Sequence, residues 1–394
     1  MLKEHVLSFM KILYIANARI PTEKAHGVNI MHMCQAFSDL GHEVVLLIPD
    51  RIQKKEQDPW DFHGVRRNFS IVRVPVFDAI SRNWLFGYWV VQWCFSFMVL
   101  FFSRSYKRNS VVYTRDEVSG WLLRLLRYRV FYDMHGFPEN KKWFWKISMK
   151  SMLGITATNH WKMHQTCEQF GISMNRMLYA PNGFDPEMFS VRDSEASIRK
   201  ELNLSFEKKI VLYSGQFYDW KGVCVLAEAA KYLPKTLFVF VGGSEPELSN
   251  FTKKYGLCNN ICVFPRKPHK EVARFLHIAD VLVLPNSALS KNSRFAVYSQ
   301  YDTSPIKMFE YMASGKPIVS SNLPSITEIL NEKNAVLVEP DHPEELFLGI
   351  ERVLKCVKES AELAKQALED VSQYSWNRRA AKVAGFMGSA IKKS

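Results

Sequence analysis

Apolar and polar positions alternate along the chain in blocks that predict strands followed by helices. Residues 11–17 (KILYIAN) form an apolar run that ends in a polar loop, and a helical pattern, a stop at Gly41 and a second apolar run follow. This order predicts a βαβ opening. Further short apolar runs begin at Val111, Arg129 and Gly154. Because strands alternate with helical segments, we expect an α/β fold.

A second series of strands follows the charged stretch 191–209, which is poor in strand-forming residues and predicts a linker. Short apolar runs at 210–213, 281–284 and 335–340 are separated by helical patterns. With 394 residues the chain is also too long for one ordinary core, and it fits two domains of roughly 150 to 200 residues. Pattern and length together predict two α/β domains.

The second domain contains a stretch, DTSPIKMFEYMASGKPIVSS, whose chemistry predicts an anion site. The Ser304 hydroxyl can cap a helix, and Pro305 suits the first helical position, so we expect the helix to begin at Pro305. A helix N-terminus with unpaired amides attracts an anion. The preceding loop carries Asp302 toward the same cleft, and Glu310 lies on the second helical turn. This layout predicts a site for a phosphate and for the hydroxyl groups around it.

The most apolar run of the chain is WLFGYWVVQWCFSFMVLFF, residues 84–102. It is nominally long enough to cross a bilayer at about 1.5 Å per residue. However, the strands on either side of it should pair in one sheet, and a single crossing would separate them. We therefore expect a helix that is buried in the domain or lies on a membrane surface. Basic and aromatic clusters from Arg104, Arg124 and Lys141 suit an anionic lipid surface, and solvated faces of ordinary helices are the alternative.

The formal net charge of +13 and the pI near 9.3 indicate an anionic partner, either a nucleotide, an anionic lipid or a nucleic acid. Nucleic acid is the least supported, because no helix-turn-helix or zinc-finger pattern occurs. Seven scattered cysteines favour reduced thiols in a cytosolic protein, and Cys258 with Cys262 lacks the matching ligands of a zinc site. No secretory pattern is present at the N-terminus, where the residues before Met10 read as an extension or a misassigned start.

The pair Asp302 and Glu310, separated by seven residues, resembles the acid, seven residues, Glu motif of the retaining glycosyltransferases of family 4, and the likeness extends through KPIVSSNLPSITEIL. The family usually has Glu at the first position, where this chain has Asp302. The resemblance implies a GT-B fold, in which two Rossmann-like domains face each other.

Two further segments resemble the family. YAPNGFDPEMF from Tyr179 resembles the segment that closes the first domain, and YSWNRRAAKVAGFM from Tyr374 resembles the terminal helix that crosses back to the first domain. The resemblance thus implies an acceptor-side domain at 1–192, a nucleotide-sugar domain at 193–372 and a helix at 373–394 that packs on the first domain.

The resemblance also implies roles for individual residues. Lys221 matches the lysine that contacts the donor diphosphate, but Gln216 replaces the arginine that usually follows the glycine, here Gly215. Lys291 and Arg294 are candidates for the missing cation. His135, just past a strand end, would contact the transferred sugar, Asp302 would hold its hydroxyls, and Glu310 would hold the ribose. The implied catalytic residues are Lys221, His135 and Asp302, and the implied donor-binding residues are Gly27, Gly215, Gln216, Lys221, Ser304, Pro305, Ile306, Lys307 and Glu310.

Within these sets, the amides of Ile306 and Lys307 are expected to face the phosphate. Gly27 closes the loop 17–27, which takes the place of the family's glycine loop; a plain strand-to-helix turn is the alternative. The function implied is retaining transfer of a sugar from a nucleotide-sugar donor to a glycan or lipid-linked acceptor, in cell-surface polysaccharide or glycolipid synthesis. No metal or other cofactor is expected, because the chain lacks an Asp-any-Asp motif.

Contact with an anionic membrane would place such an enzyme in the cytoplasm, at the inner face of the cell membrane. Two alternatives stay open: an inactive nucleotide-sugar-binding partner of a polysaccharide-assembly complex, and a nucleotide-sugar epimerase of the same fold. A dinucleotide oxidoreductase is disfavoured, since the three-glycine fingerprint after the first strand is missing.

Overall fold

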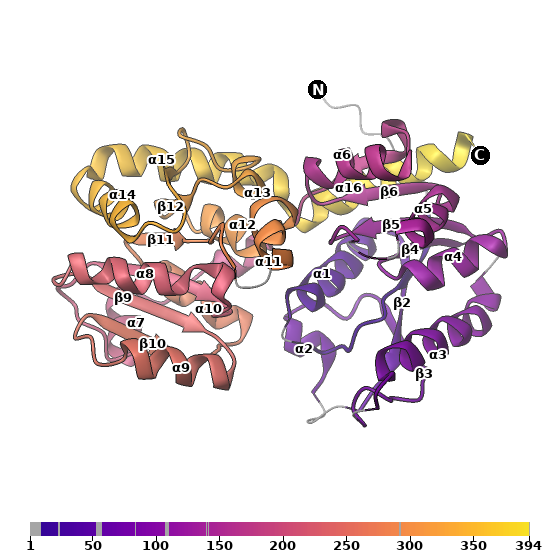
Figure 1. Ribbon diagram of the computed structural model, residues 1–394, viewed down its shortest axis with the longest axis horizontal. Coiled ribbons are helices and arrows are strands. Elements are labelled where there is room, and N and C mark those ends of the chain that lie inside the picture. Colours follow the sequence, from indigo (N-terminus) through magenta and orange to yellow (C-terminus); the bar gives the residue numbers. More distant parts are fainter. Residues whose placement is uncertain are drawn as a thin grey trace. The chain divides into compact units, whose positions relative to one another are not determined.

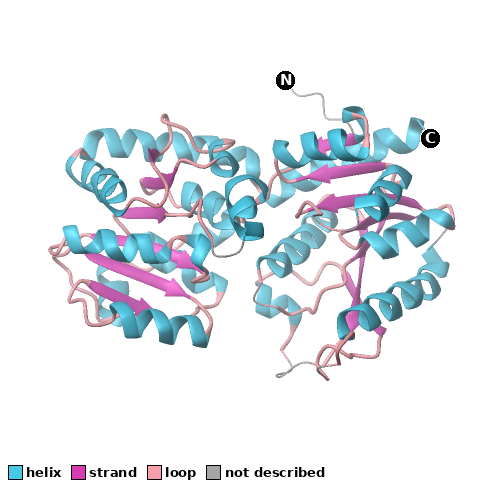
Figure 2. Cartoon of the chain, viewed as in Figure 1, coloured by secondary structure: helices cyan, strands magenta, loops and turns pink. Residues whose placement is uncertain are grey.

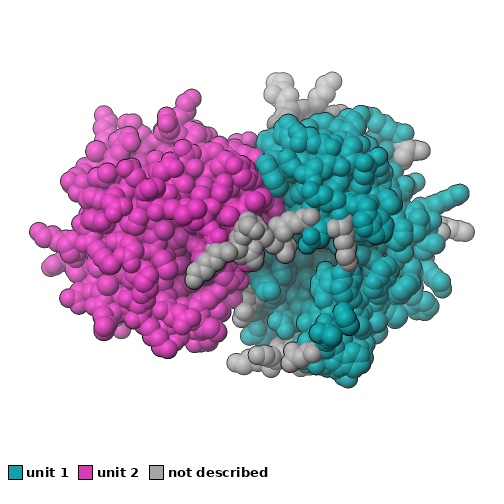
Figure 3. Space-filling model, viewed as in Figure 1, with its two compact units in different colours: residues 1–182, 376–394 teal, residues 183–375 magenta. Residues whose placement is uncertain are grey.

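A computed structural model describes residues 9–22, 24–52, 57–82, 84–106, 110–138, 140, 142–290 and 293–393, with the side chains at 270, 293 and 294 left out. The chain forms two compact units, one of residues 1–182 and 376–394 and one of residues 183–375 (Figure 3). The sequence had put the corresponding boundaries at 192 and 372. Each unit consists of a parallel sheet between helices (Figure 2).

Unit 1 contains a sheet in the order β3-β2-β1-β4-β5-β6-β7 among its described residues. All neighbours are parallel; Leu13, for example, pairs with Val45 on one side and Val112 on the other. Helices cover both faces, and the central strands are accordingly apolar on both sides. The strands are β1 (Lys11–Ile15), β2 (Glu43–Asp50), β3 (Ser70–Pro75), β4 (Ser110–Thr114), β5 (Arg129–Met134), β6 (Gly154–Ala157) and β7 (Met177–Tyr179).

The helices of unit 1 pack in two groups (Figure 1). One group contains α1, α2 and α16, and in the other α3, α4, α5 and α6 each contact the next. The predicted βαβ opening is confirmed by β1, α1 and β2. The helices are α1 (Ala25–Asp39), α2 (Pro59–His63), α3 (Gly87–Phe102), α4 (Glu117–Leu125), α5 (Lys142–Ser151), α6 (His160–Phe170) and α16 (Trp376–Lys393), with short 3-10 turns at Ser103–Tyr106 and Met174–Arg176.

Helix α3 takes up most of the apolar run 84–102. It begins at Gly87 and has two different faces. Phe95 and Val99 are buried against the sheet, whereas Trp93 and Phe97 are exposed. No helix among the described residues is both long enough and apolar enough to cross a membrane.

Unit 2 has a parallel sheet in the order β10-β9-β8-β11-β12-β13 in the part of the chain described. Its strands are β8 (Ile210–Gly215), β9 (Leu237–Gly242), β10 (Ile261–Phe264), β11 (Val281–Leu284), β12 (Ile318–Ser321) and β13 (Val336–Val338). Its helices are α7 (Glu195–Glu201), α8 (Val223–Ala229), α9 (Glu245–Tyr255), α10 (His269–His277), α11 (Ser293–Val297), α12 (Ile306–Ala313), α13 (Pro324–Thr327), α14 (Pro343–Lys355) and α15 (Val357–Val371), with a π turn at Tyr298–Asp302 and 3-10 turns at Pro186–Phe189, Asp219–Lys221, Ala230–Tyr232 and Ser372–Tyr374.

Both sheets reverse their direction of winding at one point, between β1 and β4 in unit 1 and between β8 and β11 in unit 2. In open α/β sheets, ligands bind beyond the carboxyl ends of the strands that flank such a reversal. The topology therefore directs attention to the loops after these four strands.

Candidate functional site

The loop after β8 is held against the loop after β11 by a glycine. Gly222 follows Lys221 with φ of 67°, in the left-handed region. A β-carbon at Gly222 would lie 1.7 Å from the carbonyl oxygen of Pro285, the residue directly after β11. Only glycine permits this approach. The contact brings the loops after β8 and β11 together beside Lys221.

Lys221 projects from this loop into a site that shields most of its side chain from water. Its Nζ lies 3.9 Å from the centroid of the Trp220 ring. Burial lowers the pKa of Lys221 to about 7, because little water remains to solvate the ammonium group. An anion beside Lys221 would favour the charged form again.

Lys307 brings a second buried amine to the same place. Its Nζ lies 3.8 Å from the centroid of the Tyr213 ring and 3.5 Å from the position that a β-carbon on Gly215 would occupy. This Nζ has no hydrogen-bond partner among the described residues. Burial first, and then the charge of Lys221, lower the pKa of Lys307 well below its usual value, while Glu310 opposes the shift.

Gln216, which stands where the family has arginine, contributes its backbone to this group. Its carbonyl oxygen accepts a hydrogen bond of 2.6 Å from the Tyr213 hydroxyl. Lys307 stacks on that tyrosine ring, so the second amine lies beside the loop that lost the arginine. The sequence indicated only the backbone amide of Lys307. The two candidates for the missing cation lie outside the described residues, Lys291 entirely and Arg294 with its side chain.

The helix start in the motif differs by one residue from the prediction. Helix α12 begins at Ile306 with Pro305, not Ser304, at the N-cap position. Pro305 has ψ of 123°, an extended conformation, so it ends the preceding loop instead of opening the helix. Asp302 ends the π turn before it and is buried, 6% exposed. Asp302 therefore lies in the turn that leads directly into α12.

Glu310 forms an ion pair that the sequence did not reveal. Its Oε1 lies 2.5 Å from Nε2 of His269, the first residue of α10, and the glutamate is 5% exposed. Burial would lower the pKa of His269, but the Glu310 carboxylate raises it above the usual value. The His269 imidazole therefore fixes the orientation of Glu310. Its position directly after the basic loop 265–268 was the only available signal.

In unit 1, His135 is part of a buried chain of polar groups. Its Nε2 lies 2.8 Å from Oδ2 of Asp133, and the other oxygen of Asp133 accepts a 2.8 Å bond from Nη2 of Arg379 on α16. Burial would raise the pKa of Asp133, but Arg379 and His135 lower it well below its usual range. Burial and the charge of Arg115 lower the pKa of His135 to about 3.

His135 is consequently neutral near pH 7, and its contact with Asp133 is a hydrogen bond, not an ion pair. Since a carboxylate only accepts, the proton must be on Nε2. Nδ1 then carries a lone pair, which can accept a hydrogen bond from a hydroxyl. The sequence identified His135 but missed Asp133 and Arg379. Arg379 falls on the stripe of α16 that otherwise buries Trp376, Ala380, Val383 and Met387, and this was a readable signal.

A polar pocket of about 210 Å³ lies beyond the ends of β1 and β4 in unit 1. Its walls include Asn17, Gln92, Arg115 and Asp116. Nδ2 of Asn17 donates to Oε1 of Gln92 over 2.9 Å, and Nε2 of Gln92 donates to Asp116 over 2.8 Å. These amides and charges suit a ligand rich in hydroxyls.

Other predicted residues take structural positions. Gly27 lies inside the first turn of α1, not in a loop, and a β-carbon there would come within 2.5 Å of the Thr22 side chain. Close packing therefore explains this glycine. Cys258 and Cys262 are free thiols, and the described residues contain no cluster of three or more metal-ligating side chains.

Residues 194–370 match the sequence model of the family described as glycosyl transferases group 1. This part of the chain is therefore similar to the group 1 glycosyl transferases. The chain is 28% identical over 204 residues to the putative teichuronic acid biosynthesis glycosyltransferase TuaH of Bacillus subtilis, which covers 51% of this chain and 48% of that protein. It is 27% identical over 213 residues to the lipopolysaccharide 1,2-N-acetylglucosaminetransferase of Salmonella typhimurium, covering 50% and 52%. The chain thus spans about half the length of the curated relatives it matches.

Solved structures resemble this chain over nearly its whole length. Anabaena Alr3699/HepE in complex with UDP-glucose aligns with a TM-score of 0.72 and 15% identity, covering 96% of this chain and all of that one. Sucrose-phosphate synthase from Thermosynechococcus elongatus aligns with a TM-score of 0.77 and 18% identity, covering 98% and 100%. At such identities the likeness establishes the fold, and the predicted α/β fold of GT-B type is confirmed.

Proposed function

We propose that this protein is a glycosyltransferase that moves a sugar from a nucleotide-diphosphate donor to an acceptor. The observation that carries the proposal is the pair of buried amines, Lys221 and Lys307, at the carboxyl end of β8. Two buried amines that have no acidic partner among the described residues are unfavourable alone and become favourable beside a diphosphate. The group 1 family match over unit 2 supports the same activity.

The proposed reaction retains the anomeric configuration. As the donor bond breaks, negative charge grows on the diphosphate, and pre-placed cations stabilise it. Lys221, Lys307 and the first amides of α12 supply this stabilisation, so no metal or other cofactor is assigned. The departing phosphate takes the acceptor proton on the same face of the sugar, as the family resemblance implies.

The remaining site residues orient the donor. Glu310, held by His269, binds the ribose hydroxyls, and Asp302 binds hydroxyls of the transferred sugar. His135 accepts a hydrogen bond from that sugar through Nδ1. These roles follow the family resemblance, and the contacts of Glu310 and His135 described above are compatible with them.

For the acceptor we propose a glycan or a lipid-linked glycan, bound at the polar pocket of unit 1. The names of the relatives, one in teichuronic acid biosynthesis and one in lipopolysaccharide assembly, support a role in cell-surface polysaccharide or glycolipid synthesis. We also propose peripheral contact with the inner face of the cell membrane. Helix α5 supports this contact, because it exposes Trp143 and Ile147 among the cations Lys142 and Lys146.

A panel of nucleotide sugars, tested first by thermal shift and then by transfer to saccharide acceptors, tests the proposal. A ligand that prefers the folded state raises the melting temperature. We expect stabilisation by at least one nucleotide sugar and acceptor-dependent release of the nucleoside diphosphate. Stabilisation without release would favour an inactive binding protein, and conversion of the donor without an acceptor would favour an epimerase.

Two variants then test the division of roles between the acids. Asp302→Ala should reduce transfer efficiency by about 1.5 to 3 kcal/mol, the value of a hydrogen bond to a charged group, with little change in affinity for the bare nucleoside diphosphate. Glu310→Ala should instead lower the affinity for the bare nucleoside diphosphate. Equal losses of nucleotide affinity in both variants would contradict the assignment.

A further inference from the structure

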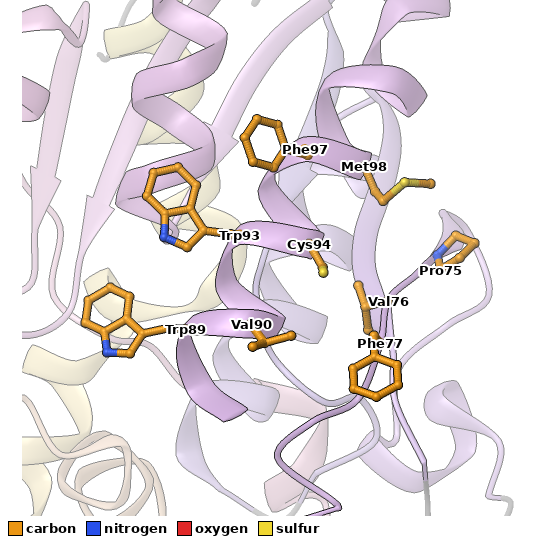
Figure 4. Close-up of a pocket in the computed structure, with 9 residues that line it drawn as sticks. All are labelled: Pro75, Val76, Phe77, Trp89, Val90, Trp93, Cys94, Phe97 and Met98. Carbon is orange, nitrogen blue, oxygen red and sulfur yellow. The ribbon is translucent and has the colours of Figure 1, made fainter. Parts of the chain in front are cut away.

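An open groove of about 900 Å³ runs along the outward face of α3 (Figure 4). Trp89, Trp93 and Phe97 lie along one side of α3, and Val76 and Phe77 lie on the other, with Cys94 between them. The spacing of four residues places the three rings in one row on the helix. Every lining group is aliphatic, aromatic or sulfur-containing. The groove therefore suits a hydrocarbon ligand.

This row of rings is partly exposed to water. Trp89 and Trp93 are each 40% exposed and Phe97 is 58% exposed. An apolar surface of this extent usually marks a binding site. The opposite face of α3 is buried against the sheet through Phe95 and Val99, so the groove lies on the exposed face of this helix.

The groove and the polar pocket meet at the first turn of α3. Tyr88 lines the pocket and Trp89 lines the groove, and their ring centroids are 5.6 Å apart. A ligand that reached from one site to the other would need a hydroxyl-rich end and a hydrocarbon end. Lipid-linked saccharides have this composition.

We infer that the groove along α3 binds the hydrocarbon chain of a lipid-linked acceptor, whose saccharide enters the polar pocket beside Tyr88. The inference rests on the proposed function, since it identifies the acceptor class of that reaction. Charge favours a lipid over a second protein. Arg82 lies 4.7 Å from the Phe77 ring and Arg104 lies 5.6 Å from the Phe101 ring, so exposed cations flank the apolar row near both ends. Such cations suit lipid phosphates.

Chain length provides the test. Monomeric n-alkyl phosphates of 6, 8 and 10 carbons, kept below their micelle concentrations, are titrated into the full chain by calorimetry. Each buried methylene should raise the affinity about fourfold, which corresponds to about 0.8 kcal/mol. In the double variant Trp93→Ala/Phe97→Ala the affinity for the longest chain should fall at least tenfold. Cys94→Arg, which places a charge between the two sides, should abolish the chain-length dependence.

The matched control is Phe206→Ala/Leu257→Ala, which removes two exposed apolar side chains from unit 2, and it should bind as the parent does. Affinity for the donor should be unchanged in every α3 variant, as measured by thermal shift with the nucleotide sugar that the panel identifies. Unchanged donor affinity also shows that these variants are folded.

The inference is overturned if affinity does not depend on chain length, or if the control double variant loses as much as the α3 variant. It is also overturned if sedimentation shows a dimer that only the α3 variants dissociate, because the groove would then bind a second copy. Transfer to a water-soluble acceptor without any alkyl binding would remove the inference and leave the proposed function intact. If no nucleotide sugar binds, the proposed function fails, and the acceptor role fails with it even where alkyl chains bind.

Discussion

At the scale of single residues, the proposed donor site depends on two amines that face different aromatic rings. Lys221 stacks on Trp220 and Lys307 stacks on Tyr213. An aromatic face stabilises an ammonium group less than water does, although it tolerates one. In the proposed function both amines await an anion, at some cost to the stability of the protein without ligand. Lys307 then compensates for the arginine that the family has at the position of Gln216.

Replacing Lys307 should show this compensation directly. We expect Lys307→Ala to lower kcat/KM by a hundredfold or more, about 3 kcal/mol, because one preorganised charge is lost. Adding Gln216→Arg to that variant should restore part of the loss, since the arginine would start from the same loop. Lys333→Ala, at an exposed lysine of the same unit, is the control and should be near the parent. Activity of Lys307→Ala within a few-fold of the parent would exclude Lys307 from the site.

The low pKa values of the two amines predict a dependence on pH. Burial lowers the pKa of Lys221 to about 7 and lowers that of Lys307 well below its usual range. At about pH 8 Lys221 is largely neutral without ligand, and a bound diphosphate raises the pKa values of both amines. Binding of a nucleoside diphosphate should therefore take up protons, and affinity should fall as the pH rises above about 7.

Calorimetry in two buffers of different ionisation enthalpy measures this uptake. Lys221→Met and Lys307→Met should each reduce the number of protons taken up at about pH 8. An uptake that is the same in the parent and in both variants would assign the protons to other groups.

At the scale of elements, the loop that ends in Gly222 determines where Lys221 points. In the left-handed region a non-glycine residue costs about 1 to 2 kcal/mol, and at Gly222 a β-carbon would also collide with the Pro285 carbonyl. Gly41 has φ of 85° with open space around it. Substitution of Gly41 therefore measures the cost of the backbone conformation without any collision.

We expect Gly41→Ala to destabilise the protein by about 1 kcal/mol and Gly222→Ala by clearly more, as judged from denaturation midpoints. Only Gly222→Ala should also weaken nucleotide binding, because the loop must move away from β11. Equal effects of the two variants on stability and on binding would show that the close approach is unimportant.

A buried ion pair connects helix α16 to the sheet of unit 1. Arg379 and Asp133 have side chains that are 2% and 0% exposed. Removing one partner of such a pair costs about 3 to 5 kcal/mol, because the other charge stays buried and unpaired. Arg379→Met should therefore destabilise unit 1 strongly, whereas Arg378→Met at the exposed neighbouring position should not.

Asp133→Asn combined with Arg379→Met should cost less than the sum of the two single variants, as a double-mutant cycle would measure. Additive losses would mean that the two side chains act independently. The low pKa of Asp133 adds a condition on pH. The ionised Asp133 carboxylate stabilises the fold above about pH 4, the pKa of an aspartate in the unfolded chain. This stabilisation is lost as the pH falls toward the much lower pKa of Asp133 in the folded protein.

The sequence determined the elements far better than it determined these contacts. Strand and helix order follows from apolar periodicity, which is local, and the motif around Asp302 and Glu310 follows from spacing. The pairs His269 with Glu310 and Arg379 with Asp133 join residues 41 and 246 positions apart, and no local pattern specifies which distant group they meet. The helix start at Ile306 instead of Pro305 reflects a local choice between two plausible caps.

At the scale of the whole molecule, the net charge of +13 combines with exposed aromatic side chains to favour anionic lipid. Each lysine near an anionic surface contributes about 1 kcal/mol, and salt screens this attraction. On α5, Lys146 and Lys150 are exposed beside Ile147.

The protein should therefore sediment with vesicles that contain anionic lipid at low salt and be partly released at high salt. Lys146→Glu/Lys150→Glu should weaken this association more than the same change at Lys253 and Lys254 on α9 of unit 2. Binding that is equally strong to neutral vesicles, or insensitive to salt, would contradict the electrostatic contact.

The discontinuity of unit 1 in the sequence has a consequence during synthesis. Domains generally fold as units while the chain emerges, the N-terminal ones first. Unit 2, residues 183–375, is one continuous segment, but unit 1 needs α16, which the ribosome supplies only after all of unit 2. Until then Asp133 lacks the guanidinium that neutralises it in the sheet. The part of the chain that is made first is therefore completed last.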